Sequence, residues 1–579
     1  MRKLPLMLFA GIVLAVSAPA QQPPQPAPAS TFFSETIEVR VINVEAVVTD
    51  RKGQPVTGLT KDDFEIYENG QKQEITNFNE IRMPVGGAAA VATAAPASAE
   101  IPAEQRSRKV ILFIDNGTLR PFNRNRILPA MKTFIHKTLR PSDQVMIAVW
   151  SGGLDIRLPF TNDFAAADKL LDQIAKQSGL GAQFDVERRM MEQQLTDAPK
   201  DYAMRGEKPP LDVGLAIVRT YATKQVHEQH QAVEAFKALL ASVRGLEGRK
   251  AAVYVTERLD ENPGKAAFDF LDQIKNQYLG GDFANMQGEE QQFIDRELVP
   301  SITRIANSSG VTLYPMDAAG LAAETESINA SENGDSHYSQ PSRMAFGLRT
   351  TAVTMGSLAS ATGGWSLANS NNFELAFNTI GNDLSTYYSI GFRAGGTRED
   401  AIRSLTVKLK NPRGLNVRTR QEFIEKSLLS EMNDAVASHL FFPIGRNDLN
   451  IRMTSGEAKA NAEAEKVDIP VDVKIPTEAL TLVPEGTDLT GHFSTYVAFV
   501  RKDGAVSKVT RQEQSLRFPA DSLKRRKEIT VRTTVTIDSR TEGISVGVMD
   551  DLSHVTGFAM MKLTPAPAAS PAAAPGATK

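Results

Sequence analysis

Three acidic residues each follow an apolar stretch of the chain, and their carboxylates are the first groups that could do chemistry. They are Asp115, Glu257 and Asp317. The preceding stretches lack polar alternation, which is typical of strands buried on both faces of a parallel sheet: Val110–Ile114, Ala251–Thr256 and Val311–Pro315. The carboxyl ends of such strands lie at one edge, where open α/β folds bind ligands. The acids there either contribute to a ligand site or cap helices and solvate loops, and Asp260 shares this ambiguity.

Strands and helices alternate on either side of these positions. After Asp115 the apolar spacing predicts a helix over residues 124–138, strands over 144–150 and 155–160, and a helix over 164–175. Gly152-Gly153 indicates a hairpin between the two strands. We therefore expect a doubly wound, mostly parallel, Rossmann-like sheet with helices on both faces.

A charged segment, Ser178–Pro210, interrupts this alternation. It is too long for an ordinary connection, which indicates either a functional loop or a disordered one. We expect it to emerge near the acidic edge, where Met190 and Met191 would offer apolar contact area. Deletion of residues 182–207 should then abolish partner binding and leave the melting temperature nearly unchanged.

Two segments carry a family resemblance. RKVILFIDNGTL (108–119) resembles the first strand and metal loop of a von Willebrand factor A (VWA) domain, and VVTDRKGQPVTGLTKDDFEIYENG (47–70) resembles a segment of exported VWA-related proteins of acidobacteria. With YYSIGFR (387–393) and SLTVKLKNPRGLNVRTR (404–420) as closing strands, the resemblance covers residues 32–425. It implies an architecture and says little about substrate.

The resemblance also implies a metal-binding loop of the form D-x-S-x-S, a second-loop Thr and a third-loop Asp, which together give oxygen ligands for a hard cation. Here the loop has Asp115, Gly117 and Leu119 at these positions, and the third loop has Glu257 after Thr256. Two hydroxyl ligands are missing. We therefore expect a degenerate metal site without a cofactor; the alternative is Mg²⁺ or Ca²⁺ held by Asp115, Thr118 and Glu257.

The partner-binding surface is expected at the same edge. Its predicted residues follow two of the strands: Asp115, Asn116, Gly117, Thr118, Leu119, Glu257 and Asp260. Apolar contacts, including Leu119, would replace the cation, so binding should persist in EDTA.

Composition limits the class of protein. The 579 residues are too many for one core, the net charge of −3 does not indicate a nucleic-acid partner, and there is no cysteine for a disulfide or a thiol site. Met1–Ala20 has the basic, apolar and small-residue zones of a cleaved secretory leader, and no later stretch is apolar enough to insert in a membrane. We expect a periplasmic or secreted protein.

The flanking regions predict two β domains. The expected order is a signal peptide (1–20), a Pro-rich spacer (21–31), a small β domain (32–82), a flexible linker (83–107), the VWA-like α/β domain (108–395), a closing β segment (396–425), an antiparallel β-sandwich (435–563) and a disordered Pro/Ala tail (564–579).

The function that this sequence favours is an exported, non-enzymatic protein-binding or adhesion protein with an unidentified protein partner. One alternative is a cation-dependent adhesion site, and another is a cell-envelope hydrolase. Oligomeric state is left open.

Overall fold

A computed structural model describes residues 41–83, 107–279, 283–321, 341–395, 399–461, 466–519, 527–538 and 540–563. The predicted leader, spacer and tail lie outside the described residues, as does nearly all of the predicted linker.

A five-stranded sheet forms the centre of the α/β region, in the order β7-β6-β5-β8-β9. Four strands are parallel and β7 pairs antiparallel with β6, as the Gly152-Gly153 hairpin signal predicted. The strands are β5 (Arg108–Asp115), β6 (Gln144–Trp150), β7 (Leu154–Thr161), β8 (Arg249–Thr256) and β9 (Val311–Asp317). This arrangement confirms a mixed α/β class with a mostly parallel sheet.

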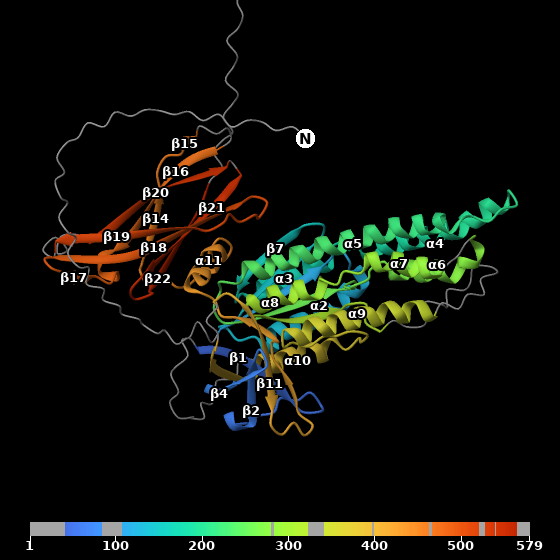
Figure 1. Cartoon of the computed structure of the whole chain (residues 1–579), viewed down its shortest axis with the longest axis horizontal. Coiled ribbons are helices and arrows are strands. Elements are labelled where there is room, and N and C mark those ends of the chain that lie inside the picture. Colours follow the sequence, from blue (N-terminus) through green and yellow to red (C-terminus); the bar gives the residue numbers. More distant parts are fainter. Residues whose placement is uncertain are drawn as a thin grey trace, which may run out of the picture. The chain divides into compact units, whose positions relative to one another are not determined.

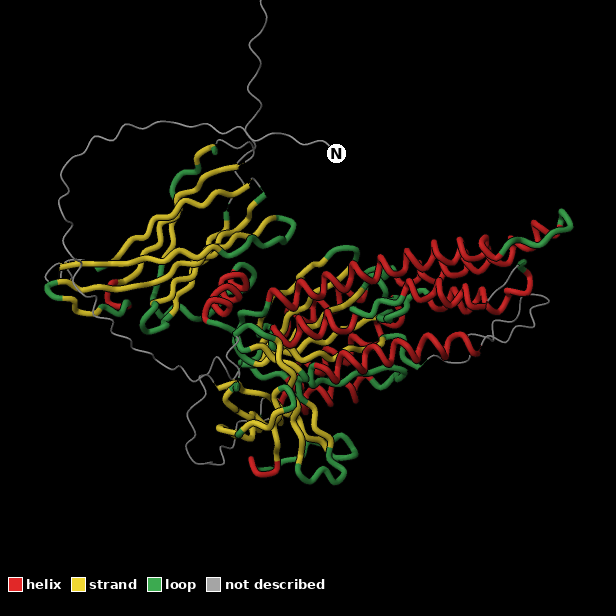
Figure 2. The backbone as a smooth tube through the Cα atoms, in the orientation of Figure 1, coloured by secondary structure: helices red, strands yellow, loops and turns green. Residues whose placement is uncertain are grey.

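Helices cover both faces of this sheet, which explains why the middle residues of its four parallel strands are apolar (Figures 1 and 2). One face packs against α2 (Pro121–Thr138), α3 (Phe164–Ala175) and α10 (Phe373–Ser385). The other packs against the second half of α5 (Leu211–Ser242), with α8 (Leu298–Ser308) and α9 (Pro341–Ala361).

A helical arm continues from the carboxyl edge of the sheet. It consists of α4 (Gly181–Ala203), the first half of α5, α6 (Lys265–Ile274) and α7 (Phe283–Glu290), which lie side by side (Figure 1). The arm has its own apolar cluster, to which α4 contributes Met191 and Leu195. The expected loop over 178–210 is therefore wrong, because these buried side chains hold most of that segment in a helix.

The N-terminal strands form two antiparallel sheets together with strands that follow the parallel sheet. Their orders are β12-β1-β10-β4 and β13-β11-β2-β3. The strands are β1 (Val41–Thr49), β2 (Phe64–Glu68), β3 (Gln71–Gln73), β4 (Ile75–Arg82), β10 (Thr386–Arg393), β11 (Ile402–Leu409), β12 (Asn416–Arg418) and β13 (Glu422–Ile424). One apolar cluster joins the two sheets, so the segments that the sequence placed at 32–82 and 396–425 fold together.

The C-terminal strands form two further antiparallel sheets. One contains β14 (Arg452–Ser455), β15 (Lys459–Ala460), β16 (Lys466–Pro476) and β20 (Glu528–Asp538); the other contains β17 (Val483–Glu485), β18 (Asp488–Arg501), β19 (Thr510–Pro519), β21 (Thr541–Asp550) and β22 (Thr556–Lys562). Alternating side chains of both sheets share one apolar cluster. The helix α11 (Leu428–His439) precedes them.

Candidate functional site

Asp115 ends β5 at the carboxyl edge of the parallel sheet and is fully buried. Its carboxylate accepts hydrogen bonds from the Thr256 hydroxyl (3.0 Å) and the Thr118 amide (3.3 Å). The hydroxyls of Thr118 and Thr256 lie 2.9 Å apart. Burial raises the pKa of Asp115 to about 6, because a poorly solvated site disfavours the charged form. The structure thus assembles one carboxylate and two hydroxyls.

The other residues predicted in this loop do not form an exposed surface. Asn116, Thr118 and Leu119 are 3%, 8% and 0% exposed, and Leu119 belongs to the apolar cluster under α2. The expectation that Leu119 offers contact area to a partner is wrong, because its side chain is used in the core. Packing also explains the glycine at position 117. A Cβ on Gly117 would lie 3.1 Å from the Trp150 ring, so a serine there would crowd the indole.

The connection between α3 and α4 covers this loop. Leu180 donates its amide to the Asn116 carbonyl and Gly181 donates to the Leu119 carbonyl, each at 3.2 Å. A Cβ on Gly181 would lie only 2.3 Å from the Thr118 carbonyl oxygen, so glycine is required for the close approach. The spacing Gly179-Leu180-Gly181 is the sequence signal for this contact, and neither glycine was among the predicted site residues.

Glu257 is held by an internal cation. Its two carboxylate oxygens accept from the Arg120 amide (2.8 Å) and the Arg120 guanidinium (2.9 Å). The same guanidinium makes a two-point bond to Asp185 on α4, with both distances 2.8 Å. Burial raises the pKa of Glu257, while Arg120 opposes that rise. Arg120 therefore connects the loop after β5, the end of β8 and the first turns of α4.

This donor set fits a divalent cation poorly. Both Glu257 oxygens already accept hydrogen bonds from Arg120, whose positive charge would repel an incoming cation. Only the Asp115 carboxylate and two threonine hydroxyls remain, and Asp115 already accepts from Thr118 and Thr256. Among the described residues, no group of three His, Asp or Glu side chains is placed to hold a metal.

The two remaining acids lie in different surroundings. Asp317, at the end of β9, is 2% exposed, and its carboxylate accepts from the Ala319 amide at 2.9 Å. Burial raises its pKa to about 7, and the Glu257 charge adds to that shift. Asp260 lies against α5, where its backbone exchanges two hydrogen bonds with the Gln229 side chain. Its own carboxylate accepts from the amide of Asn262.

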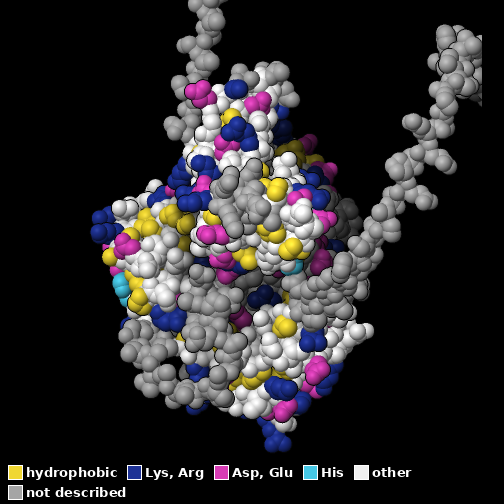
Figure 3. Space-filling model, turned by 90° about the vertical axis from the view of Figure 1, so that its left-hand side faces the viewer, with side chains coloured by type: hydrophobic (Ala, Val, Ile, Leu, Met, Phe, Trp, Pro, Cys, Tyr) yellow, Lys and Arg dark blue, Asp and Glu magenta, His cyan; other side chains and the backbone are white. Residues whose placement is uncertain are grey.

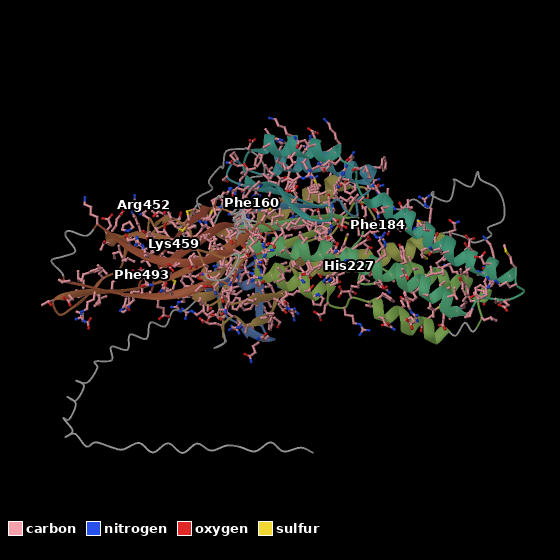
Figure 4. The ribbon with its side chains drawn as sticks, turned by 90° about the horizontal axis from the view of Figure 1, so that it is seen from above. Phe160, Phe184, His227, Arg452, Lys459 and Phe493 are labelled. Carbon is pink, nitrogen blue, oxygen red and sulfur yellow. The ribbon has the colours of Figure 1, made fainter. Side chains whose placement is uncertain are left out.

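Exposed apolar side chains occur beside this edge rather than on it. Leu180, Val186 and Met190 are 44%, 49% and 56% exposed, and Phe122 at the start of α2 is 73% exposed. The prediction that Met190 and Met191 both offer contact area is therefore wrong for Met191, which packs inside the arm. Phe184, labelled on α4 in Figure 4, holds this helix in place by stacking under the Arg258 guanidinium at 4.4 Å.

Comparisons with known proteins do not establish a family. No protein-family model matches the chain and no curated protein matches it. Among solved structures, an aerotolerance-related membrane protein from Bacteroides fragilis is 12% identical, covers 48% of this chain and 98% of its own, and has a TM-score of 0.24. The conserved hypothetical protein BatB from Bacteroides thetaiotaomicron is 13% identical, covers 48% and 97%, and has a TM-score of 0.19. Scores this low support no conclusion about function.

Proposed function

We propose that this chain is an exported, non-enzymatic protein-binding protein with a VWA-like α/β domain and a degenerate metal site. The observation that supports this proposal most directly is the pair of ionic hydrogen bonds made by Arg120. Its guanidinium places a positive charge beside Glu257 at the carboxyl edge and binds Asp185 on α4. Such an edge holds an adjacent surface in a fixed geometry without recruiting a metal. The C-terminal sheets, which we interpret as a β-sandwich, would serve as a spacer or a second adhesive surface.

The partner is proposed to contact the outer face of α4 and the first turn of α2. Val186 and Met190 are four residues apart on α4, so they lie on one face of the helix. Rigid presentation of apolar side chains beside polar ones is typical of the centre of a protein interface. Figure 3, which views the molecule from the side of the C-terminal sheets, shows Lys and Arg side chains interspersed with Asp and Glu on that face.

A paired-substitution experiment tests this surface. The double variant Val186→Asp and Met190→Asp is immobilised and exposed to envelope extract, next to the wild type and a control with Leu552→Asp. Leu552 is similarly exposed, at 51%, but lies after β21. We expect one protein to be retained by the wild type and the control and lost by the double variant. Equal retention by all three, or release of that protein by EDTA alone, would refute the proposal.

A cation-dependent adhesion site is the second candidate, because Asp115, Thr118 and Thr256 do bring three oxygen-bearing side chains together. Thermal unfolding with MgCl₂ against EDTA tests it. A rise in melting temperature that is lost in Asp115→Asn would favour this candidate over the first. The hydrolase alternative gains no comparable support: His492 and Ser515 lie 3.1 Å apart, but as exposed cross-strand neighbours.

Export is also proposed, on the pattern of the first twenty residues. Among the residues that the structure describes, none of the helices combines the length and apolar character that a membrane span needs. Intact-mass measurement of the protein recovered from its source should show Gln21 as the first residue. A full-length cytoplasmic product would contradict export without affecting the surface assignment.

A further inference from the structure

Cations begin two adjacent strands at the amino edge of the parallel sheet, opposite the edge described above. Arg108 and Lys109 start β5, and Arg249 and Lys250 start β8; the pairing register places like residues side by side. Alternation along a strand sends the two arginines to one face and the two lysines to the other. Both arginines are matched by acids: Arg108 pairs with the buried Asp143, and Arg249 Nε lies 2.9 Å from a Glu45 oxygen.

Lys250 is not matched in this way. It is only 6% exposed, and its ammonium donates to the backbone carbonyl of Leu246. Among the described residues, none places a carboxylate within ion-pair distance of it. Burial, together with the charges of Lys426, Lys109 and Arg420, lowers the pKa of Lys250 to about 7. A buried ammonium surrounded by other cations is unfavourable unless an anion is present.

Arg420 lies near this ammonium. A Cβ added to Gly310 would be in van der Waals contact with both side chains, 3.9 Å from Lys250 Nζ and 4.0 Å from a terminal nitrogen of Arg420. Lys250 also lines a cavity of about 560 Å³ with Tyr387, Leu246 and other residues of the amino edge and of α11.

The acids that line this cavity are largely engaged by other cations. Asp434 lies 2.8 Å from Lys426, and Glu247 lies 2.8 Å from Arg446. The Glu45 carboxylate attracts Lys250 electrostatically, but it lies against Arg249. The cavity thus combines a deeply buried cation, paired acids and apolar walls.

We propose that this cavity binds the oxyanion group of a small organic molecule, a carboxylate or a phosphate, with Lys250 as its principal partner. The oxyanion would accept from the two N–H directions of the ammonium that Leu246 leaves free. A purely structural role explains the geometry less well, because a methionine would fill the same volume without burying a charge. This proposal is independent of the protein-binding surface, which lies at the other edge of the sheet.

Sulfate is a suitable probe because it stays doubly charged near neutral pH. Isothermal titration of the full mature chain with sulfate, at about pH 6 where Lys250 is protonated, should show one saturable site. We expect Lys250→Met to weaken binding by about tenfold or more, the loss of one charge-assisted hydrogen bond. Lys176→Met is the matched control, since Lys176 is an exposed lysine at the end of α3 and its loss should leave affinity unchanged.

Competition then identifies the oxyanion. Displacement of sulfate by methyl phosphate, by acetate or by both supports the site and shows which oxyanion it prefers. The proposal is overturned if sulfate does not saturate, if Lys250→Met binds like the wild type, or if neither competitor displaces it. Native-like tryptophan fluorescence of each variant excludes misfolding as the cause of lost binding.

Discussion

Replacement of Asp317 by Asn should make the α/β domain more stable at alkaline pH than at acidic pH, relative to the wild type. Asp317 is 2% exposed at the end of β9, and burial raises the pKa of its carboxyl group from 3.8 to about 7. Because the folded-state pKa is raised, the folded protein keeps a proton that the unfolded chain has already lost. Stability of the wild type therefore falls as pH rises from about 4 to about 7, and this contribution is constant above that range.

The size of the effect follows from the shift. About three pKa units at roughly 1.4 kcal/mol each correspond to a cost of about 4 kcal/mol at pH 8, as an upper estimate. The part of that cost already present at pH 5 corresponds to about one pKa unit, or roughly 1.4 kcal/mol. Asparagine keeps an acceptor for the Ala319 amide and cannot ionise. We therefore expect the stability of Asp317→Asn, relative to the wild type, to increase by about 3 kcal/mol between pH 5 and pH 8.

Urea unfolding followed by tryptophan fluorescence measures this domain selectively. The chain has two tryptophans: Trp150 in β6, and Trp365, which packs against the core beneath α2 and α10. Asp155→Asn serves as the control, because that carboxylate is 62% exposed. A stability difference between Asp317→Asn and the wild type that is the same at both pH values would refute the reasoning.

Three further predictions concern packing at the carboxyl edge and in the arm. Leu119→Ala should cost about 2–5 kcal/mol, because it empties a fully buried position; surface-like behaviour in urea unfolding would contradict the burial. Gly181→Val should destabilise by about 1–3 kcal/mol or more, because its Cβ meets the Thr118 carbonyl, whereas Gly288→Val, with open space around it, should preserve the unfolding midpoint more closely. Deletion of residues 182–207 should now lower the melting temperature by several degrees, as it removes Met191 and Leu195 from the arm; an unchanged value would restore the loop prediction.

Much of the parallel sheet could be predicted because fully apolar strands and amphipathic helices have strong local signals. The strand at 144–150 and the helix at 164–175 have the predicted boundaries. The helix α4 was missed because its apolar face is narrow: two of its buried side chains, Met191 and Leu195, lie among charged residues and alongside Pro199. Neither the burial of Leu119 nor the role of Arg120 has a local signal, since both depend on segments about 60 to 140 residues away.

The carboxyl edge keeps three acids close together and binds each of them differently. The Thr256 hydroxyl and the Thr118 amide donate to the Asp115 carboxylate, Arg120 donates to Glu257, and Asp317 accepts from a backbone amide and has a raised pKa. Because Arg120 also holds Asp185, any change that protonates or removes Glu257 also alters the anchorage of α4. The proposed binding face on α4 is therefore mechanically connected to the acidic edge. We therefore expect Glu257→Gln to lose partner binding even though Val186 and Met190 are unchanged.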